Sequence, residues 1–116
     1  MQDFSNSTDR LMSINLAIGQ YPILSDRIRH KMRQELFRRN IITQVDFESE
    51  VREKAIQSQA REGVNNPVGE EAADVWEKRT TRVRDQLTDL LFSQHFSYDL
   101  FQEIVTRVLV ERGINT

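Results

Sequence analysis

The chain lacks cysteine altogether and contains only two prolines and four glycines in 116 residues. The absence of cysteine excludes disulfide bonds, thiolate metal ligands and thiol nucleophiles. It is in keeping with a reducing compartment, and we expect the protein to be cytoplasmic. The few prolines and glycines lie between segments with periodic apolar residues, an arrangement that argues against a disordered chain.

An excess of charge of either sign is also lacking. The chain has 16 basic and 18 acidic residues and a net charge of -2, so its bulk charge predicts no affinity for nucleic acid or for an anionic membrane. Long hydrophobic runs are missing as well. The apolar-rich stretch 11–24 is interrupted by polar residues and a proline and is too short to span a bilayer. We therefore expect a soluble protein without a membrane partner.

What the chain does contain is typical of one globular domain. A chain of 116 residues can bury a core without help from a metal or a disulfide bond, so we expect a single helical domain over residues 1–116. The sequence also leaves open that this domain is the N-terminal module of a longer protein.

The spacing of apolar residues predicts five helices, over residues 8–18, 25–40, 44–63, 67–94 and 97–113. The clearest signal is in residues 67–94, whose apolar side chains fall within an arc of about 100° at the helical period. These side chains are Ala72, Trp76, Thr80, Val83, Leu87, Leu90 and Leu91. The sequence thus predicts an all-α bundle of four main helices and a shorter N-terminal one, with Trp76, Val83 and Leu87 in its core.

Local signals set the expected helix ends. Ser25 and Ser97 are good N-cap residues, because a serine hydroxyl accepts a hydrogen bond from an unpaired backbone N–H of the first turn. Asn40 and Gly113 suit the left-handed conformation that often ends a helix. The pair Asn66-Pro67 favours a helix start.

The first and last helices have the widest apolar faces. Helix 8–18 is apolar nearly all round, and helix 97–113 is apolar over about half its circumference. Two interpretations of the last helix stay open. It is either a central helix covered by its neighbours, or a partner interface with Phe101, Val105 and Val108 as apolar anchors. In the second case the simplest partner is another copy of the chain, in a two-fold homodimer.

Helix 25–40 carries the local excess of basic side chains. Arg27, Lys31 and Arg38 lie on one edge of its apolar stripe, and Arg29 and Arg33 lie on the other. Such rows can bind phosphates. They can also be solvated or pair with acids, for which Glu48, Glu50 and Glu53 of the next helix are candidates.

No grouping of residues indicates catalysis or metal binding. His30 and His95 have no carboxylate at helical ligand spacing, and Ser93 and Ser97 flank His95 in sequence only. The acidic clusters lie on polar helix faces, where acid–base pairs are not desolvated. We therefore expect no metal, no cofactor and no enzymatic activity.

These observations favour a non-enzymatic protein–protein interaction module, regulatory or accessory to a larger assembly. Phe101, Val105 and Val108 are its expected anchors, and the arginines of helix 25–40 provide complementary charge. The alternative is a nucleic-acid-associated protein that uses Arg27, Lys31 and Arg38 of the basic helix 25–40.

Overall fold

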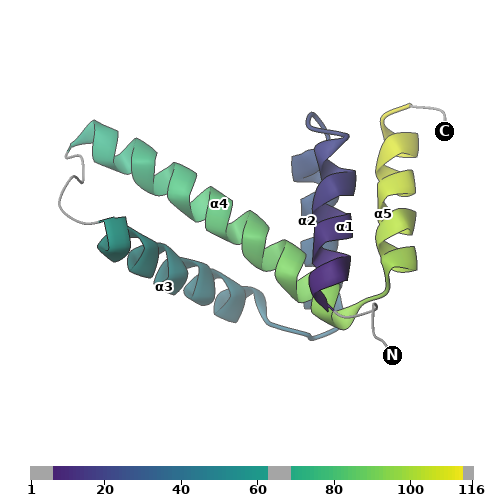
Figure 1. Ribbon diagram of the computed structural model, residues 1–116, viewed down its shortest axis with the longest axis horizontal. Coiled ribbons are helices and arrows are strands. Elements are labelled where there is room, and N and C mark those ends of the chain that lie inside the picture. The colour runs from purple at the N-terminus through teal and green to yellow at the C-terminus, as the bar shows by residue number, and fades with distance from the viewer. Residues whose placement is uncertain (1–6, 63–68, 114–116) are drawn as a thin grey trace. The chain divides into compact units, whose positions relative to one another are not determined.

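The computed structural model describes residues 7–62 and 69–113, which form five helices and no strand (Figure 1). The helices are α1 (Ser7–Gly19), α2 (Ser25–Arg38), α3 (Gln44–Glu62), α4 (Glu70–His95) and α5 (Tyr98–Glu111). The predicted all-α fold is confirmed. The N-terminal helix is shorter than the others, as expected, but the difference is slight. Helix α1 has 13 residues, and α2 and α5 have 14 each. None of the described helices has the length and apolarity needed to cross a membrane.

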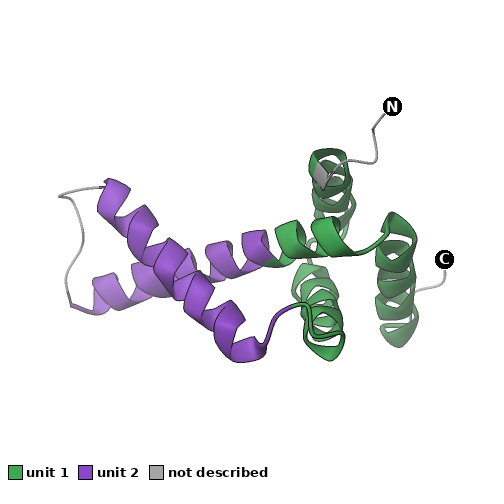
Figure 2. Cartoon of the chain, turned by 90° about the horizontal axis from the view of Figure 1, so that it is seen from below, with its two compact units in different colours: residues 1–41, 88–116 green, residues 42–87 purple. Residues whose placement is uncertain are grey.

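The chain divides into two compact units (Figure 2). Unit 1 comprises residues 1–41 and 88–116, and unit 2 comprises residues 42–87. The boundary falls inside α4, so that this helix belongs to both units. The single domain expected over residues 1–116 stays a prediction.

Unit 1 is a small helical bundle with a continuous apolar core. Its helices α1, α2 and α5 pack against one another, and the last turns of α4 add Phe92, which is fully buried. The ring of Phe92 lies 4.8 Å from that of Phe96 and 6.4 Å from that of Phe101, within the range of favourable aromatic pairs. Sequence-distant segments are thus held around one phenylalanine.

The apolar face of α5 is covered within unit 1. Phe101, Val105 and Val108 all belong to the buried core, together with Ile104 and Leu109. Of the two interpretations of this helix, the structure therefore favours the central core helix. The three residues expected as partner anchors are core residues here, because α1 and α2 supply the cover that the sequence alone did not reveal.

Helix α1 leaves part of its apolar surface exposed. Its residues Ile14 and Ile18 are buried in the core, but Met12 and Leu16 are 59% and 69% exposed. A helix that is apolar nearly all round predicts cover on most sides. That prediction is wrong, since the neighbours of α1 within unit 1 pack on one side of it. An uncovered apolar row remains on α1.

Several helix ends follow the local signals. The Ser97 hydroxyl accepts a hydrogen bond from the Leu100 N–H at 3.2 Å and so caps α5. Asn40 and Gly113 both adopt positive φ, at 58° and 77°. The Ser25 prediction is wrong, because Leu24 occupies the N-cap position of α2. The Ser25 hydroxyl instead donates to the Pro22 carbonyl oxygen at 3.0 Å.

Helix α4 has buried residues along most of its length. The prediction that Trp76 is one of them is wrong. Val83 and Leu87 are buried, whereas Trp76 is only half-buried. The residue of α4 in the core of unit 1 is Phe92. The predicted helix start at Pro67 and the predicted stop of the preceding helix at Gly63 lie outside the described residues.

A buried ion pair connects α2 to α4 in unit 1. The Asp89 carboxylate is almost fully buried and accepts from Arg29 Nη2 at 2.8 Å and from Arg29 Nε at 3.0 Å. The neighbouring Arg33 donates to the Thr88 hydroxyl at 3.1 Å. Because a buried charge is stable only when it is paired, these contacts make the register between the two helices specific.

We expect Phe92→Ala to lower the free energy of unfolding by about 3–5 kcal/mol, because the substitution leaves a cavity in a fully packed core. Urea unfolding followed by circular dichroism measures this loss. Val110→Ala is the control, since Val110 is 63% exposed on α5, and its effect should lie within about 0.5 kcal/mol. Equal effects of the two substitutions would contradict the assignment of Phe92 to the core.

We expect Asp89→Ala to lower the free energy of unfolding by about 3–5 kcal/mol, because the Arg29 side chain, 16% exposed, loses the carboxylate that offsets its desolvation. The double variant Arg29→Met with Asp89→Leu should recover most of that loss, since it removes both charges. Urea unfolding of the three proteins makes the comparison. A double variant as unstable as Asp89→Ala would show that the charge of Arg29 is not the cause.

Candidate functional site

The structure brings together two of the three predicted basic residues. Arg27 and Lys31 of α2 both pair with Glu111 of α5, at 3.5 Å and 3.0 Å. Arg38 pairs instead with Glu35 of its own helix at 2.8 Å. A phosphate at Arg27 and Lys31 would compete with a carboxylate already in place, and nucleic-acid association stays a prediction.

The acids expected to pair with α2 do so nowhere in the described ion pairs. Arg29 pairs with Asp89, and Glu48 of α3 pairs with Arg84 of α4. Within unit 1, α2 packs with α1 and α5 and pairs with Asp89 of α4. Basic side chains of α2 therefore do pair with acids, as one of the two interpretations predicts. The acids are on α4, α5 and α2 itself.

The residues considered for catalysis have structural contacts. Ser93 is buried, and its hydroxyl donates to the Leu90 carbonyl at 2.7 Å, while Ser97 caps α5. His30 and His95 are both exposed. Within residues 7–62 and 69–113, no three histidine or acidic side chains form a group that could hold a metal ion.

Unit 2 has a surface groove of about 470 Å³ between α3 and α4. We call it the hairpin groove, and it is lined by Glu48, Val51, Arg52, Trp76, Thr80 and Arg84. Helical spacing explains the set. Residues 48, 51 and 52 follow at i, i+3 and i+4 on α3, and residues 76, 80 and 84 follow at i, i+4 and i+8 on α4.

Two polar clamps hold α3 against α4. Arg84 donates two hydrogen bonds to Glu48, from Nη2 at 2.8 Å and from Nε at 3.0 Å. Arg79, only 5% exposed, donates to the Ser58 hydroxyl at 2.9 Å and also binds the Glu62 carboxylate. Bidentate Arg–carboxylate contacts fix geometry as well as adding energy, so the clamps keep the wall of the groove in place.

The clamps also shift the pKa values of their members. The hydrogen bond from Arg79 holds the pKa of Glu62 below its usual range, and burial opposes this only in part. The hydrogen bond to Glu48 likewise raises the pKa of Arg84 further above its ordinary value. The Glu62 carboxylate is therefore held in the charged form.

Arg52 is the basic side chain at the groove that no clamp uses. It is exposed, and it makes no ion pair among the described residues. Val45 and Ile56 are also exposed, at 78% and 50%, and their spacing of seven and four residues from Arg52 places them in one row with it on α3. Half-buried Trp76 contributes an aromatic surface from α4.

The groove can bind a ligand that is apolar and anionic at once. Val51 and Trp76 offer apolar contact, and the Arg52 guanidinium offers two parallel donors to a carboxylate. Glu48, which would repel such a ligand, is already neutralised by Arg84. Sequence reasoning placed Trp76 on the dry side of its helix but singled out neither Arg52 nor Arg84, since their juxtaposition depends on α3 lying beside α4.

No family model, no curated protein and no solved structure matches this chain.

We expect stability to fall as the pH is lowered from about 5 through the acid range, and Glu62→Gln to make this fall shallower. The pKa of Glu62 is lower in the folded state than its ordinary 4.5. The unfolded chain therefore binds the proton first, so the stabilisation is complete above the ordinary value and is lost below it.

Thermal unfolding at a series of pH values measures this dependence. Glu53→Gln is the matched control, because Glu53 lies on the same helix, is exposed and makes no ion pair in the described part of the chain. Identical pH dependence in the two variants would show that the Arg79–Glu62 clamp does not stabilise unit 2.

Proposed function

We propose that this protein is a non-enzymatic protein–protein interaction module whose hairpin groove receives an amphipathic helix from a protein partner. The single observation that carries the proposal is the position of Trp76 beside Arg52, an aromatic surface next to an arginine without an ion pair among the described residues. Tryptophan and arginine are the residues most enriched among those that dominate binding energy at protein interfaces.

The construction of unit 2 supports a helical ligand. Two helices can bury only the stripes that face each other, and here these stripes contain Phe47, Val51 and Ala55 of α3 and Val83 and Leu87 of α4. Val45 and Ile56 remain exposed on the outer row of α3. A third helix laid along the seam between α3 and α4 would cover Trp76 and the side of this row, as in ordinary helical bundles.

The lining of the groove defines the chemistry of that helix. Apolar side chains three or four residues apart would meet Val51 and Trp76, the usual anchors of helix-in-groove binding. An aspartate or glutamate one turn away would meet Arg52. Such a carboxylate gains more from Arg52 than from the already paired Arg84, because it displaces no existing ion pair.

Site-specific photocrosslinking in the source cells tests this function. With a benzophenone side chain in place of Ile56, we expect a discrete covalent adduct with a protein partner. The same group in place of Thr106, which is exposed on α5, should give no such adduct. The absence of any protein adduct at position 56 would contradict the proposal.

Two substitutions locate the binding energy in the groove. Arg52→Glu reverses an exposed charge, and Trp76→Ala removes the aromatic anchor. Each should weaken the partner's affinity by a factor of about 10–30, the range of an interface residue worth about 1.4–2 kcal/mol.

Circular dichroism separates lost binding from lost folding, and Arg52→Lys, which retains the charge, should retain part of the affinity. Crosslinking that is unchanged in both Arg52→Glu and Trp76→Ala would place the partner elsewhere on the protein.

A further inference from the structure

The two rims of the hairpin groove carry opposite charges that no described ion pair uses. The α3 rim has Arg52. The α4 rim is the row that contains Arg84, and Glu77 and Glu70 precede Arg84 in this row at intervals of seven residues. Both glutamates are exposed, and neither makes an ion pair in the part of the chain that the structure describes. Since Glu48 neutralises Arg84, the α3 rim is basic and the α4 rim is acidic.

The two helices that form these rims run antiparallel (Figure 1). Glu48 near the start of α3 contacts Arg84, whereas the later Ser58 contacts the earlier Arg79. Because α-helices are right-handed, the rows that line the groove also fix the side on which each helix lies. When the groove is viewed from outside with α4 running upward, the basic rim of α3 is on the left and the acidic rim of α4 is on the right.

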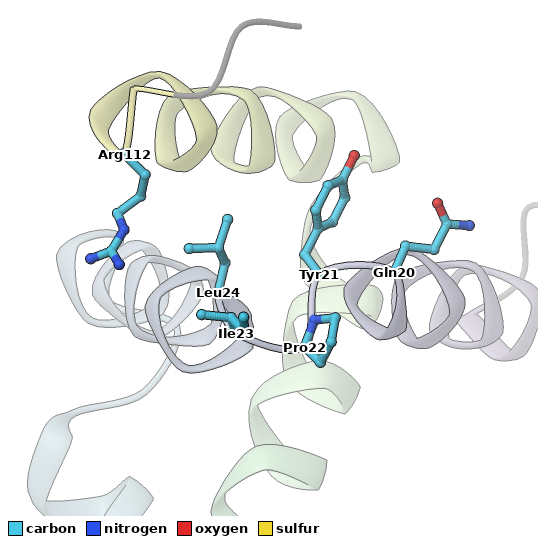
Figure 3. Close-up of a pocket in the computed structure, with 6 residues that line it drawn as sticks. All are labelled: Gln20, Tyr21, Pro22, Ile23, Leu24 and Arg112. Carbon is cyan, nitrogen blue, oxygen red and sulfur yellow. The ribbon is translucent and has the colours of Figure 1, made fainter.

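A hollow in unit 1 has no such pair of rims. It measures about 360 Å³ and is lined by residues 20–24 and by Arg112 at the end of α5 (Figure 3). Arg112 is the one charged residue of this lining, so the hollow has no second, opposite charge with which to orient a ligand. It is therefore a suitable internal control for binding at the groove.

We propose that the partner helix has acidic side chains along one flank of its apolar stripe and basic side chains along the other, and that this division sets its direction in the groove. The inference rests on the proposed function, because it describes the helix that the groove receives. The acidic flank lies over α3 and meets Arg52, and the basic flank lies over α4 and meets Glu77. Charges beside an apolar seam set orientation in coiled coils in the same way.

The right-handed helix turns this division into a rule for the partner's sequence. In a helix with leucine at heptad positions a and d, positions e and g flank the apolar stripe on opposite sides. When such a helix lies in the groove and runs in the direction of α4, position e faces α3 and position g faces α4. In the opposite direction the two positions exchange sides. Acid at e with base at g therefore predicts the direction of α4, and the exchanged charges predict the direction of α3.

Three synthetic peptides of three heptads test the rule with the whole chain. Each has leucine at a and d. The first has glutamate at e and lysine at g, the second has these charges exchanged, and the third has glutamate at both positions. We expect fluorescence anisotropy to show binding of the first two, and binding of the third at least about threefold more weakly, because its glutamates meet Glu70 and Glu77.

A nitroxide label at the N-terminus of each peptide reports its direction, through the paramagnetic broadening of the protein's amide NMR signals. The first peptide should broaden the signal of Ala73, near the start of α4, more than that of Val45, near the start of α3. The second peptide should do the reverse. The signals of Tyr21 and Leu24 at the hollow of unit 1 should stay sharp with both peptides.

Exchange of the rim charges should reverse the direction of both peptides. The variant combines Arg52→Glu and Glu77→Lys with Glu70→Gln. The matched control combines Lys54→Glu with Glu71→Lys, which makes the same two charge reversals at exposed positions turned away from the groove, and it should leave both directions unchanged. Circular dichroism establishes that both variants are folded.

Failure of this inference and failure of the proposed function give different results. Peptides that bind in the groove in a direction independent of their flanking charges would overturn the charge rule but leave the groove as a site for a helix. Equal affinity of the third peptide would do the same. If none of the peptides perturbs the signals of Val51 and Trp76, the groove receives no helix, and both the proposed function and this inference are overturned.

Discussion

The burial of Phe92 is the interaction on which unit 1 depends. This side chain comes from the last turns of α4 and packs in one core with residues of α1, α2 and α5. The Arg29–Asp89 pair lies one turn earlier on the same helix, so apolar packing and a specific ionic contact act on the same segment. The apolar contact supplies most of the free energy, while the ion pair limits the ways in which α2 and α4 can align.

The two units achieve stability by different means. Unit 1 has a core to which four helices contribute, and the largely buried Arg29–Asp89 ion pair connects α2 to α4 beside it. Unit 2 has a narrower buried stripe and adds two arginine clamps across its helices. A helix pair with so little apolar burial is marginal on its own, and this is a physical reason for proposing that the seam of unit 2 receives another helix.

Features encoded in a few neighbouring residues could be predicted from the sequence. The all-α class follows from helical periodicity, and the ends at Asn40, Ser97 and Gly113 follow from local backbone and capping preferences. Ser25 shows the limit of such signals, because its hydroxyl has a second option, the carbonyl oxygen of Pro22. A pattern of cap residues does not reveal which hydrogen bond is formed.

Features that depend on which helices meet could not be predicted in this way. The apolar width of α1 and α5 suggests the same need for cover in both, yet α5 is covered and α1 keeps exposed Met12 and Leu16. The rows of basic residues on α2 were visible, but their partners Asp89 and Glu111 lie far along the chain. The hairpin groove exists only once α3 lies beside α4, so neither Arg52 nor Arg84 stands out before that.

The two clamps of unit 2 have a consequence for how the hairpin tolerates change in its sequence. Each clamp fixes the axial position of α3 against α4 through side chains within the helices, at Glu48 and Arg84 and again at Glu62 and Arg79. The connection between Glu62 and Gly69 therefore does not need to set the register. Loop closure becomes only slightly more costly as a loop lengthens. Residues could thus be gained or lost between the helices during evolution while the geometry of the groove is preserved.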